Sequence, residues 1–329
     1  MTTPVRIVAV GHALVDVLVQ VDVGVIERHS LKHGGMHLVD GMAAAMLYDE
    51  VGPGVMQSGG SIANTIAHLA VAGIPTAFIG RVAEDTLGAA FVADLERLGV
   101  ECPAQPLVEP IGDGSPDQQK LGTGRCVILV TPGGERTMST YLGAAQVVTP
   151  ADAALIPEDA AMVAVEGYLF DAPGGAEAIA AAAGRARQIG GKVVLSPSDA
   201  GCVGRHLAAM RGFIQAHCDI IVGNEAEMIA LSGAGSADAA LDWALDHVET
   251  GVVTLSEKGA MAGQAGERAT VPAESVAEVV DTTGAGDAFA AGFLGAFVRG
   301  QDLEASCRAG CAVSARVITH LGARDHAAT

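Results

Sequence analysis

Short apolar segments alternate with alanine-rich segments along nearly the whole chain, and this alternation excludes most all-α and all-β folds. The apolar segments are rich in Val, Ile and Leu, as is typical of strands that are buried on both faces. We expect strands over residues 6–10, 76–80, 162–165, 192–195, 220–222 and 252–255. We expect helices over residues 61–72, 86–98, 175–189, 205–216 and 237–247. This order predicts a three-layer α/β/α fold, in which helices cover both faces of a mainly parallel sheet.

Two segments interrupt the alternation, residues 14–57 and 102–145. Both are rich in glycine and polar residues, and both contain stretches in which apolar and polar residues alternate, which is typical of half-exposed strands. We therefore expect these segments to form a small β lid beside the main sheet. Residues 109–123 hold most of the local glycine and proline and are expected to form a mobile loop. No linker divides the chain, so we expect one domain over residues 1–329.

The charge balance excludes several classes of function. The chain has 19 Lys and Arg against 38 Asp and Glu, which gives a net charge of −19. Such a surface repels phosphate backbones and anionic lipids, so we expect no nucleic-acid partner and no membrane partner. The apolar run over residues 288–298 is far shorter than the ~20 residues that span a membrane. The six cysteines form no Cys-x-x-Cys pair, which favours a reduced, cytoplasmic protein.

One glycine-rich segment has the pattern of an anion site. Asp281-Thr-Thr-Gly-Ala-Gly-Asp287 comes directly before a predicted apolar helix. Glycines allow backbone N–H groups to converge, and the start of a helix adds a positive dipole end. Asp287 would lie in the first helical turn, where a general base for phosphoryl transfer belongs. The alternative is that Asp287 only caps the helix.

Other phosphate-binding motifs are absent from the sequence. None of the four lysines is followed by Ser or Thr, so there is no Walker A loop. No Gly-x-Gly-x-x-Gly occurs, which removes the main argument for a dinucleotide-dependent dehydrogenase. The His-Arg-Asp and Asp-Phe-Gly motifs of protein kinases are also missing.

Several motifs together resemble those of the ribokinase-like, or PfkB, carbohydrate and nucleoside kinases. The segment 281–293 resembles the C-terminal signature of that family, and the segments 58–67 and 80–88 resemble its N-terminal signature. Asn224-Glu-Ala-Glu227 is similar to its Asn-x-x-Glu motif. The segment 254–259 resembles its nucleotide-binding turn, although Ser256 stands where glycine is usual. The matches occur in the family's order and span nearly the whole chain.

The resemblance implies a kinase that uses ATP and Mg²⁺ to phosphorylate a hydroxymethyl group. Asp287 matches the general base, and the backbone amides of Gly284, Ala285 and Gly286 match an anion hole for the transferred phosphoryl group. Arg136, in the second lid segment, would reach the γ-phosphate; the alternative is an exposed hairpin arginine. Asp281 and the carbonyl of Thr283 match positions that hold a monovalent cation in some relatives, so K⁺ activation is a hypothesis.

The resemblance also implies nucleotide-binding and metal-binding residues. Asn224, Thr254, Ser256 and Gly259 match nucleotide-binding positions. Glu227 matches a residue near Mg²⁺, which binds through water because Mg²⁺ takes few protein ligands. Asn-x-x-Glu at a helix start is also a capping box, so both readings stay open.

The acceptor side of the site follows from the same resemblance. Asp16, Gly59, Gly60 and Asn64 match positions that hold sugar hydroxyls, and a carboxylate with an amide suits vicinal hydroxyls. The alternatives are a strand-end carboxylate for Asp16 and an amide bonded to backbone for Asn64.

Three segments resemble the adenosine kinase branch of the family. They are residues 12–16, which begin with His12, residues 32–40, which contain Met36, and residues 135–145. Met36 and Leu38 would cover a purine, and Tyr168 or Phe170 would stack on it; ordinary packing is the alternative. We therefore expect adenosine as acceptor, with a simple sugar such as ribose or fructose as the alternative. A binding protein that lost catalysis is a further alternative, which the intact Asp287 disfavours. Both a monomer and a homodimer remain open.

Overall fold

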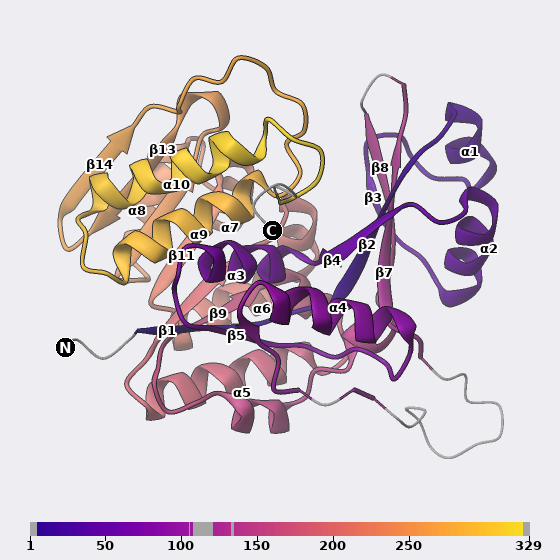
Figure 1. Cartoon of the computed structure of the whole chain (residues 1–329). Coiled ribbons are helices and arrows are strands. Elements are labelled where there is room, and N and C mark those ends of the chain that lie inside the picture. Colours follow the sequence, from indigo (N-terminus) through magenta and orange to yellow (C-terminus); the bar gives the residue numbers. More distant parts are fainter. Residues whose placement is uncertain (1–4, 105, 108–120, 133–134, 325–329) are drawn as a thin grey trace.

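The structure is a computed structural model, and it describes residues 5–104, 106–107, 121–132 and 135–324. Its centre is a sheet of nine strands in the order β14-β13-β12-β11-β10-β9-β1-β5-β6 (Figure 1). The strands from β12 to β6 run parallel, whereas β13 and β14 form antiparallel pairs at one edge. The strand bounds are β1 Arg6–Val10, β5 Thr76–Ile79, β6 Val100–Glu101, β9 Ala160–Glu166, β10 Lys192–Ser196, β11 Ile220–Asn224, β12 Thr250–Thr254, β13 Ala260–Gln264 and β14 Glu267–Val271.

Helices cover both faces of this sheet, because its strands are apolar on both sides. In β1, Val8 and Val10 belong to one buried cluster, and Ile7 and Ala9 belong to another. The first cluster lies under α5 Gly175–Gln188, α6 Ala200–His217, α7 Glu225–Ser232 and α8 Ala237–Leu245. The second lies under α3 Ser61–Val71, α4 Thr86–Arg97, α9 Ala285–Phe297 and α10 Leu303–Val317. The expected three-layer α/β/α arrangement is confirmed.

A second sheet of five strands stands beside the main one (Figure 1). Its order is β3-β8-β7-β2-β4, with bounds β2 Leu14–Gln20, β3 Met36–Leu38, β4 Val55–Gly59, β7 Gly124–Val130 and β8 Arg136–Tyr141. These strands fall almost entirely within the two segments expected to form a lid. Two helices that the sequence pattern did not indicate, α1 Val23–Arg28 and α2 Gly41–Val51, pack on one face of this sheet. Residues 109–120 of the loop expected over 109–123 lie outside the described residues.

Two helix starts differ from the expected ones: a side-chain cap precedes the first, and a left-handed glycine precedes the second. The helix expected from residue 205 begins at Ala200, because the carboxylate of Asp199 accepts a hydrogen bond from the amide of Cys202. The helix expected from residue 288 begins at Ala285, after Gly284 in a left-handed conformation. The first turn of α9 therefore contains Ala285, Gly286 and Asp287.

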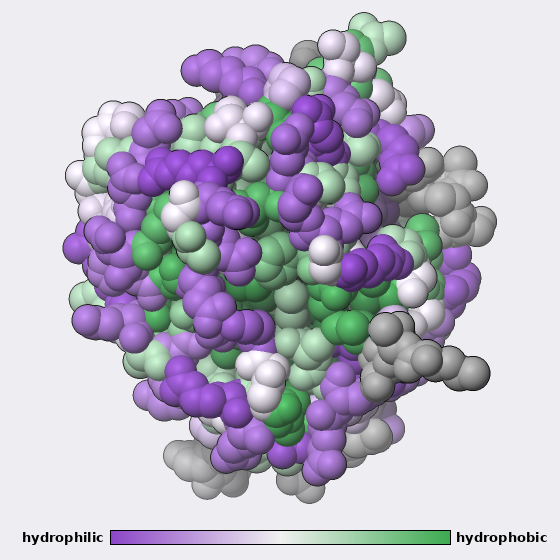
Figure 2. Space-filling view, turned by 90° about the vertical axis from the view of Figure 1, so that its left-hand side faces the viewer, coloured by the Kyte–Doolittle hydropathy of each residue, from purple (hydrophilic) through white to green (hydrophobic). Residues whose placement is uncertain are grey.

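The surface is largely polar on the face that Figure 2 shows, with hydrophobic residues showing through near its centre. None of the helices in the described part of the chain is both long enough and apolar enough to cross a membrane. All six cysteines are free, and five of them are buried.

Candidate active site

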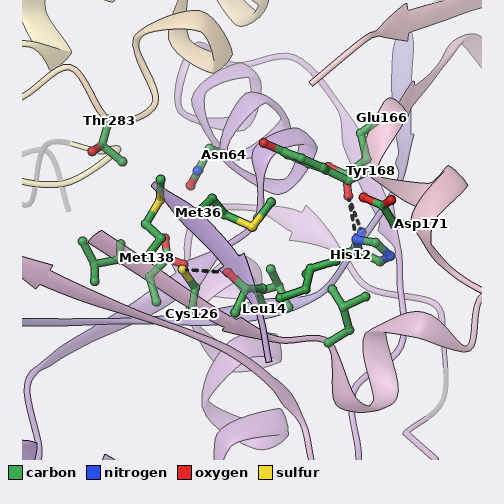
Figure 3. Close-up of a pocket in the computed structure, with 16 residues that line it drawn as sticks. His12, Leu14, Met36, Asn64, Cys126, Met138, Glu166, Tyr168, Asp171 and Thr283 are labelled. Carbon is green, nitrogen blue, oxygen red and sulfur yellow. Dashed lines mark hydrogen bonds and ion pairs between the residues drawn. The ribbon is translucent and has the colours of Figure 1, made fainter. Parts of the chain in front are cut away.

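A pocket lies at the carboxyl ends of β1 and β9, between the main sheet and the five-stranded sheet (Figure 3). It encloses about 740 Å³ of empty space, including its mouth. Ligands of parallel α/β sheets gather at this edge, particularly where neighbouring connections diverge. The lining residues are His12, Leu14, Asp16, Met36, Leu38, Gly60, Asn64, Cys126, Ile128, Met138, Thr140, Leu142, Glu166, Tyr168, Asp171 and Thr283. Every strand of the five-stranded sheet except the edge strand β4 contributes to this lining.

One end of the pocket is built around the buried carboxylate of Glu166. Its Oε1 accepts a hydrogen bond from the amide of His12 at 2.7 Å, and its Oε2 accepts one from the amide of Ile62 at 2.9 Å. Burial raises the pKa of Glu166 to about 7 and lowers the pKa of His12 to about 4. The imidazole is therefore neutral near pH 7. Its Nε2 is buried and has no hydrogen-bond partner among the described residues, so it can bond to a bound molecule.

Asp16 lies beside this end, against Gly59 at the end of β4 and Gly60 directly after it. A Cβ on Gly59 would lie 2.2 Å from Cγ of Asp16, so only glycine leaves room for the carboxylate. Gly60 has a φ of 93°, and a Cβ there would lie 2.4 Å from the carbonyl oxygen of His12. Burial raises the pKa of Asp16 to about 7. The structure thus brings together Asp16, Gly59, Gly60 and His12, as the sequence predicts.

Asp287 lies in the first turn of α9, next to the start of α3. The hydroxyl of Ser61 donates to its Oδ1 at 2.6 Å, and Nδ2 of Asn64 donates to its Oδ2 at 3.3 Å. Burial raises the pKa of Asp287 to about 6, and both hydrogen bonds oppose the rise. Asn64 also lines the pocket, so Asp287 is directly linked to the pocket wall.

The glycine loop before α9 is held by a side chain from the five-stranded sheet. Arg136, in β8, forms an ion pair with Asp281 and donates to the hydroxyl of Thr283 at 2.6 Å. The Asp281 carboxylate also accepts the amides of Thr283 at 2.9 Å and Gly322 at 2.6 Å. Arg136 is thus not an exposed hairpin residue, because its side chain is only 12% exposed.

The expected anion hole is only partly available in this arrangement. The amide of Ala285 donates to the carbonyl of Thr282 at 3.1 Å, which closes the turn before the helix. The amides of Gly286 and Asp287 lie in the first turn of α9, where a helix provides no carbonyl of its own. The dipole of α9 adds positive potential at the same point.

The residues expected to bind nucleotide meet at the carboxyl ends of β11 and β12. Asn224 and Thr254 are register partners in the two strands. Asn224 and Glu227 form the capping box: the amide of Glu227 donates to Asn224 at 2.9 Å, and the amide of Asn224 donates back at 3.0 Å. Burial raises the pKa of Glu227 to about 7.

The turn after β12 contains Ser256, the position at which the family that the sequence resembles usually has glycine. Ser256 has a φ of 54°, a left-handed conformation that favours glycine. Gly259 has a φ of 98° and closes the turn by accepting the amide of Leu255 at 2.7 Å. Serine is therefore in a strained position in this turn.

Tyr168 and Phe170, the two aromatic residues expected to stack on a base, have different surroundings. Tyr168 lines the pocket, and its amide donates to Ser198 at 3.1 Å. Phe170 is only 8% exposed, belongs to the main core and packs against Phe213 with ring centroids 6.3 Å apart. The two side chains diverge because residues 167–171 form a 3-10 turn. Met36 lies in the pocket wall, and Figure 3 places it across from Glu166.

Sequence reasoning missed part of the site, including four polar or charged residues in or near the pocket. These are Ser61 and Glu166, described above, Asp171 in the lining, and Arg324, which contacts Ser58. An acidic residue at the end of an otherwise apolar strand was the available signal for Glu166. No sequence signal places Arg324 near Ser58, because the two residues are 266 positions apart.

This arrangement of residues belongs to a chain that matches a known protein family over most of its length. Residues 39–329 match the sequence model of the family described as pfkB family carbohydrate kinase. The chain belongs to the pfkB family. It is 27% identical to the adenosine kinase of Saccharomyces cerevisiae over 98% of this chain and 96% of that protein. It is 26% identical to the ribokinase of Haemophilus influenzae over 81% of this chain and 83% of that one.

Solved structures agree with this pfkB assignment. The adenosine kinase from Sinorhizobium meliloti superposes with a TM-score of 0.88 at 34% identity, covering 98% of this chain and 97% of that one. A probable sugar kinase from Rhizobium etli gives a TM-score of 0.87 at 34% identity, covering 99% and 96%. The ribokinase-like fold is thereby confirmed. This pfkB protein is an ATP-using phosphotransferase that acts on a hydroxyl group of a nucleoside or a sugar.

Proposed function

We propose that the protein transfers the γ-phosphoryl group of ATP to the 5′-hydroxyl of adenosine and forms AMP and ADP. The observation that carries the proposal is the link between Asp287 and the pocket through Asn64 and Ser61. This link places a carboxylate of raised pKa where the pocket opens toward the glycine loop. The single domain over residues 1–329, a role in purine salvage and a cytoplasmic location belong to the same proposal.

In the proposed reaction, Asp287 accepts the proton of the acceptor hydroxyl as that oxygen attacks the γ-phosphorus. The new O–P bond forms while the bond to the β-phosphate oxygen breaks, and ADP leaves with that electron pair. A pKa of about 6 leaves Asp287 mainly ionised at neutral pH but still able to accept a proton. The first-turn amides of α9, the glycine loop and Arg136 face the developing negative charge and stabilise it.

The residues at the start of α7 fit Mg²⁺ held through water. Both oxygens of Glu227 already accept hydrogen bonds from Asn224, so each keeps only its remaining lone pair for a water ligand. No group of three or more His, Cys, Asp or Glu residues in the described part of the chain is arranged to hold a metal ion directly. Bound Mg²⁺ would neutralise the phosphates of ATP. Asn224, Thr254, Ser256 and Gly259 would lie along the nucleotide.

The residues expected for K⁺ do not fit a cation in this arrangement. Arg136 and the amides of Thr283 and Gly322 already occupy the carboxylate of Asp281. The guanidinium supplies the positive charge that a cation would bring. We therefore include no monovalent cation in the proposed function.

The shape of the pocket supports a nucleoside rather than a free sugar. Beyond the polar residues around Glu166, its wall includes apolar side chains from β3, β7 and β8, namely Met36, Leu38, Ile128 and Met138. A free pentose has no large apolar face and would leave much of this apolar wall in contact with water. Tyr168 offers a ring face for stacking on a base. Ribose or fructose stays the alternative acceptor, because His12, Asp16 and Asn64 also suit a sugar alone.

The five-stranded sheet would act as a lid. It covers the pocket, and Arg136 ties it to the glycine loop, so closure would exclude water that competes with the acceptor. The exposed edge of this sheet is compatible with a monomer or a homodimer.

The test is ADP release with ATP and Mg²⁺ against adenosine, inosine, guanosine, ribose, fructose and no acceptor. We expect the highest kcat/KM with adenosine, and AMP as product. Turnover with a free sugar alone would replace adenosine in the proposal and leave the roles of Asp287 and Asp16 in place. No turnover above the acceptor-free rate would overturn the proposal.

A further inference from the structure

Arg324 is a buried cation that the proposed reaction does not use. It follows α10, and only 8% of its surface is exposed. Its Nη2 donates to the hydroxyl of Ser58 at 2.8 Å and lies 3.4 Å from Oδ2 of Asp94. An arginine that is buried this far needs partners of opposite charge, because the desolvation of an ion is costly. Its partners therefore indicate where its charge acts.

Asp94 connects Arg324 to the backbone of β4. Its Oδ2 accepts a hydrogen bond from the amide of Ser58 at 3.0 Å and one from the hydroxyl of Ser58 at 2.5 Å. A second arginine, Arg97, contacts the other oxygen of Asp94 at 2.8 Å, but its side chain is 52% exposed. Three hydrogen bonds thus hold Ser58 in place. Its amide and its hydroxyl both donate to Asp94, and its hydroxyl accepts one from the guanidinium of Arg324.

Ser58 directly precedes the two glycines that shape the acceptor site. In the antiparallel pair of β2 and β4, Ser58 is opposite Val15 and Gln57 is opposite Asp16. The carboxylate of Asp16 fills the space that a side chain at Gly59 would need. A shift of Ser58 would therefore move the surface against which Asp16 is packed.

The charges around Asp16 come from several elements. Burial raises its pKa to about 7; the guanidinium of Arg324 opposes this rise, and Asp287 in α9 adds to it. Cys126 in β7 is opposite Asp16. Burial, followed by the charge of Asp16, raises the pKa of its thiol, so the thiol stays neutral. Arg324 is thus the positive group that acts on this carboxylate.

We propose that Arg324 is a positioning residue for the acceptor. It fixes the Ser58–Gly60 backbone, and its positive charge favours the ionised form of Asp16, which accepts hydrogen bonds from the acceptor hydroxyls. This inference rests on the proposed function, and it assigns Arg324 to acceptor binding alone. Transfer of the phosphoryl group at Asp287 and binding of ATP do not depend on it.

The two roles can be separated with two substitutions. Arg324→Gln keeps a donor for Ser58 but removes the charge. Because an acid without its cation has a higher pKa, the acid limb of kcat/KM for the acceptor moves to higher pH by about one unit. Arg324→Lys keeps the charge, so the acid limb of kcat/KM should stay at its wild-type pH. A lysine ammonium cannot reproduce the planar set of donors of a guanidinium, so KM for the acceptor should rise roughly fivefold.

Two further measurements distinguish positioning from a general loss of structure. KM for ATP and the acceptor-free hydrolysis of ATP should stay at the wild-type values in both variants. Arg97→Met is the matched control, since it removes the exposed arginine from the same Asp94, and its pH profile should be unchanged. Ser58→Ala should raise KM for the acceptor without moving the pH limb.

Wild-type KM and an unmoved acid limb in Arg324→Gln would overturn the proposal. If the glutamine variant does not fold, a wild-type KM in both Arg324→Lys and Ser58→Ala would overturn it as well. A wild-type protein without acceptor-dependent turnover would instead overturn the proposed function, and this inference with it.

Discussion

The hydroxyl of Ser61 donates a hydrogen bond to Oδ1 of Asp287 at 2.6 Å, across 226 positions of sequence. The contact joins the start of α3 to the start of α9, and Asn64 adds a second bond one turn further along α3. In the same turn of α3, the amide of Ile62 donates a hydrogen bond to the carboxylate of Glu166. One helix start therefore orients the proposed base and shapes the acceptor pocket together.

This relationship predicts the effect of Ser61→Ala on pH dependence. The hydroxyl stabilises the ionised form of Asp287, so its loss raises the pKa of that carboxyl above its present value of about 6. The reaction needs the ionised form, and the acid limb of kcat should therefore move to higher pH, by about half a unit. Measurement of kcat from pH 5 to 9 checks this. Thr65→Val is the control, because Thr65 bonds to the backbone carbonyl of Asp287 at 3.2 Å and not to its carboxylate.

Asp287→Asn should abolish most of the activity without loss of fold. Asparagine can keep the contact with Ser61, but it cannot accept the proton, so we expect kcat to fall about a thousandfold. Acceptor KM should change little, because the binding residues stay in place. Undiminished ATP-dependent turnover in this variant would remove Asp287 as the base.

The sequence predicts those parts of the molecule that depend on local patterns. Strands such as β1 and β9 are apolar on both faces, and the capping box at Asn224 and Glu227 can be predicted from residue types alone. The contacts of Arg136 with Asp281 and of Arg324 with Ser58 cannot be predicted in this way, because they depend on how distant elements pack. Phe170 shows the same limit, since a short 3-10 turn directs it into the core while Tyr168 lines the pocket.

The activity should not depend on K⁺. Arg136 and two amides bond to the carboxylate of Asp281, and the guanidinium already supplies the positive charge beside it. Rates in KCl and in tetramethylammonium chloride at equal ionic strength should be the same. Arg136→Gln would leave Asp281 as a buried carboxylate without a counter-charge, and in that variant KCl should raise the Tm. Strong activation of the wild-type protein by KCl would show that the arginine leaves this carboxylate during turnover.

Ser256→Gly should stabilise the protein. Ser256 has a φ of 54°, and a left-handed residue with a side chain costs about 1 kcal/mol relative to glycine. Urea unfolding should therefore give a free energy of unfolding that is higher by about 1 kcal/mol. Ser256→Ala is the matched control, because it removes the hydroxyl but keeps the Cβ, and it should bring no gain.

Tyr168 and Phe170 provide a test of the base pocket, because two aromatic residues of one short turn have different surroundings. Tyr168→Ala removes a ring from the pocket wall, and the loss of stacking should raise KM for adenosine about tenfold. Tyr168→Phe keeps the ring and should keep the KM. Phe170→Leu should leave KM unchanged and lower the free energy of unfolding by about 1 kcal/mol, because Phe170 packs in the core. A wild-type KM in Tyr168→Ala would mean that the ring does not contact a base, and it would favour a free sugar as the acceptor.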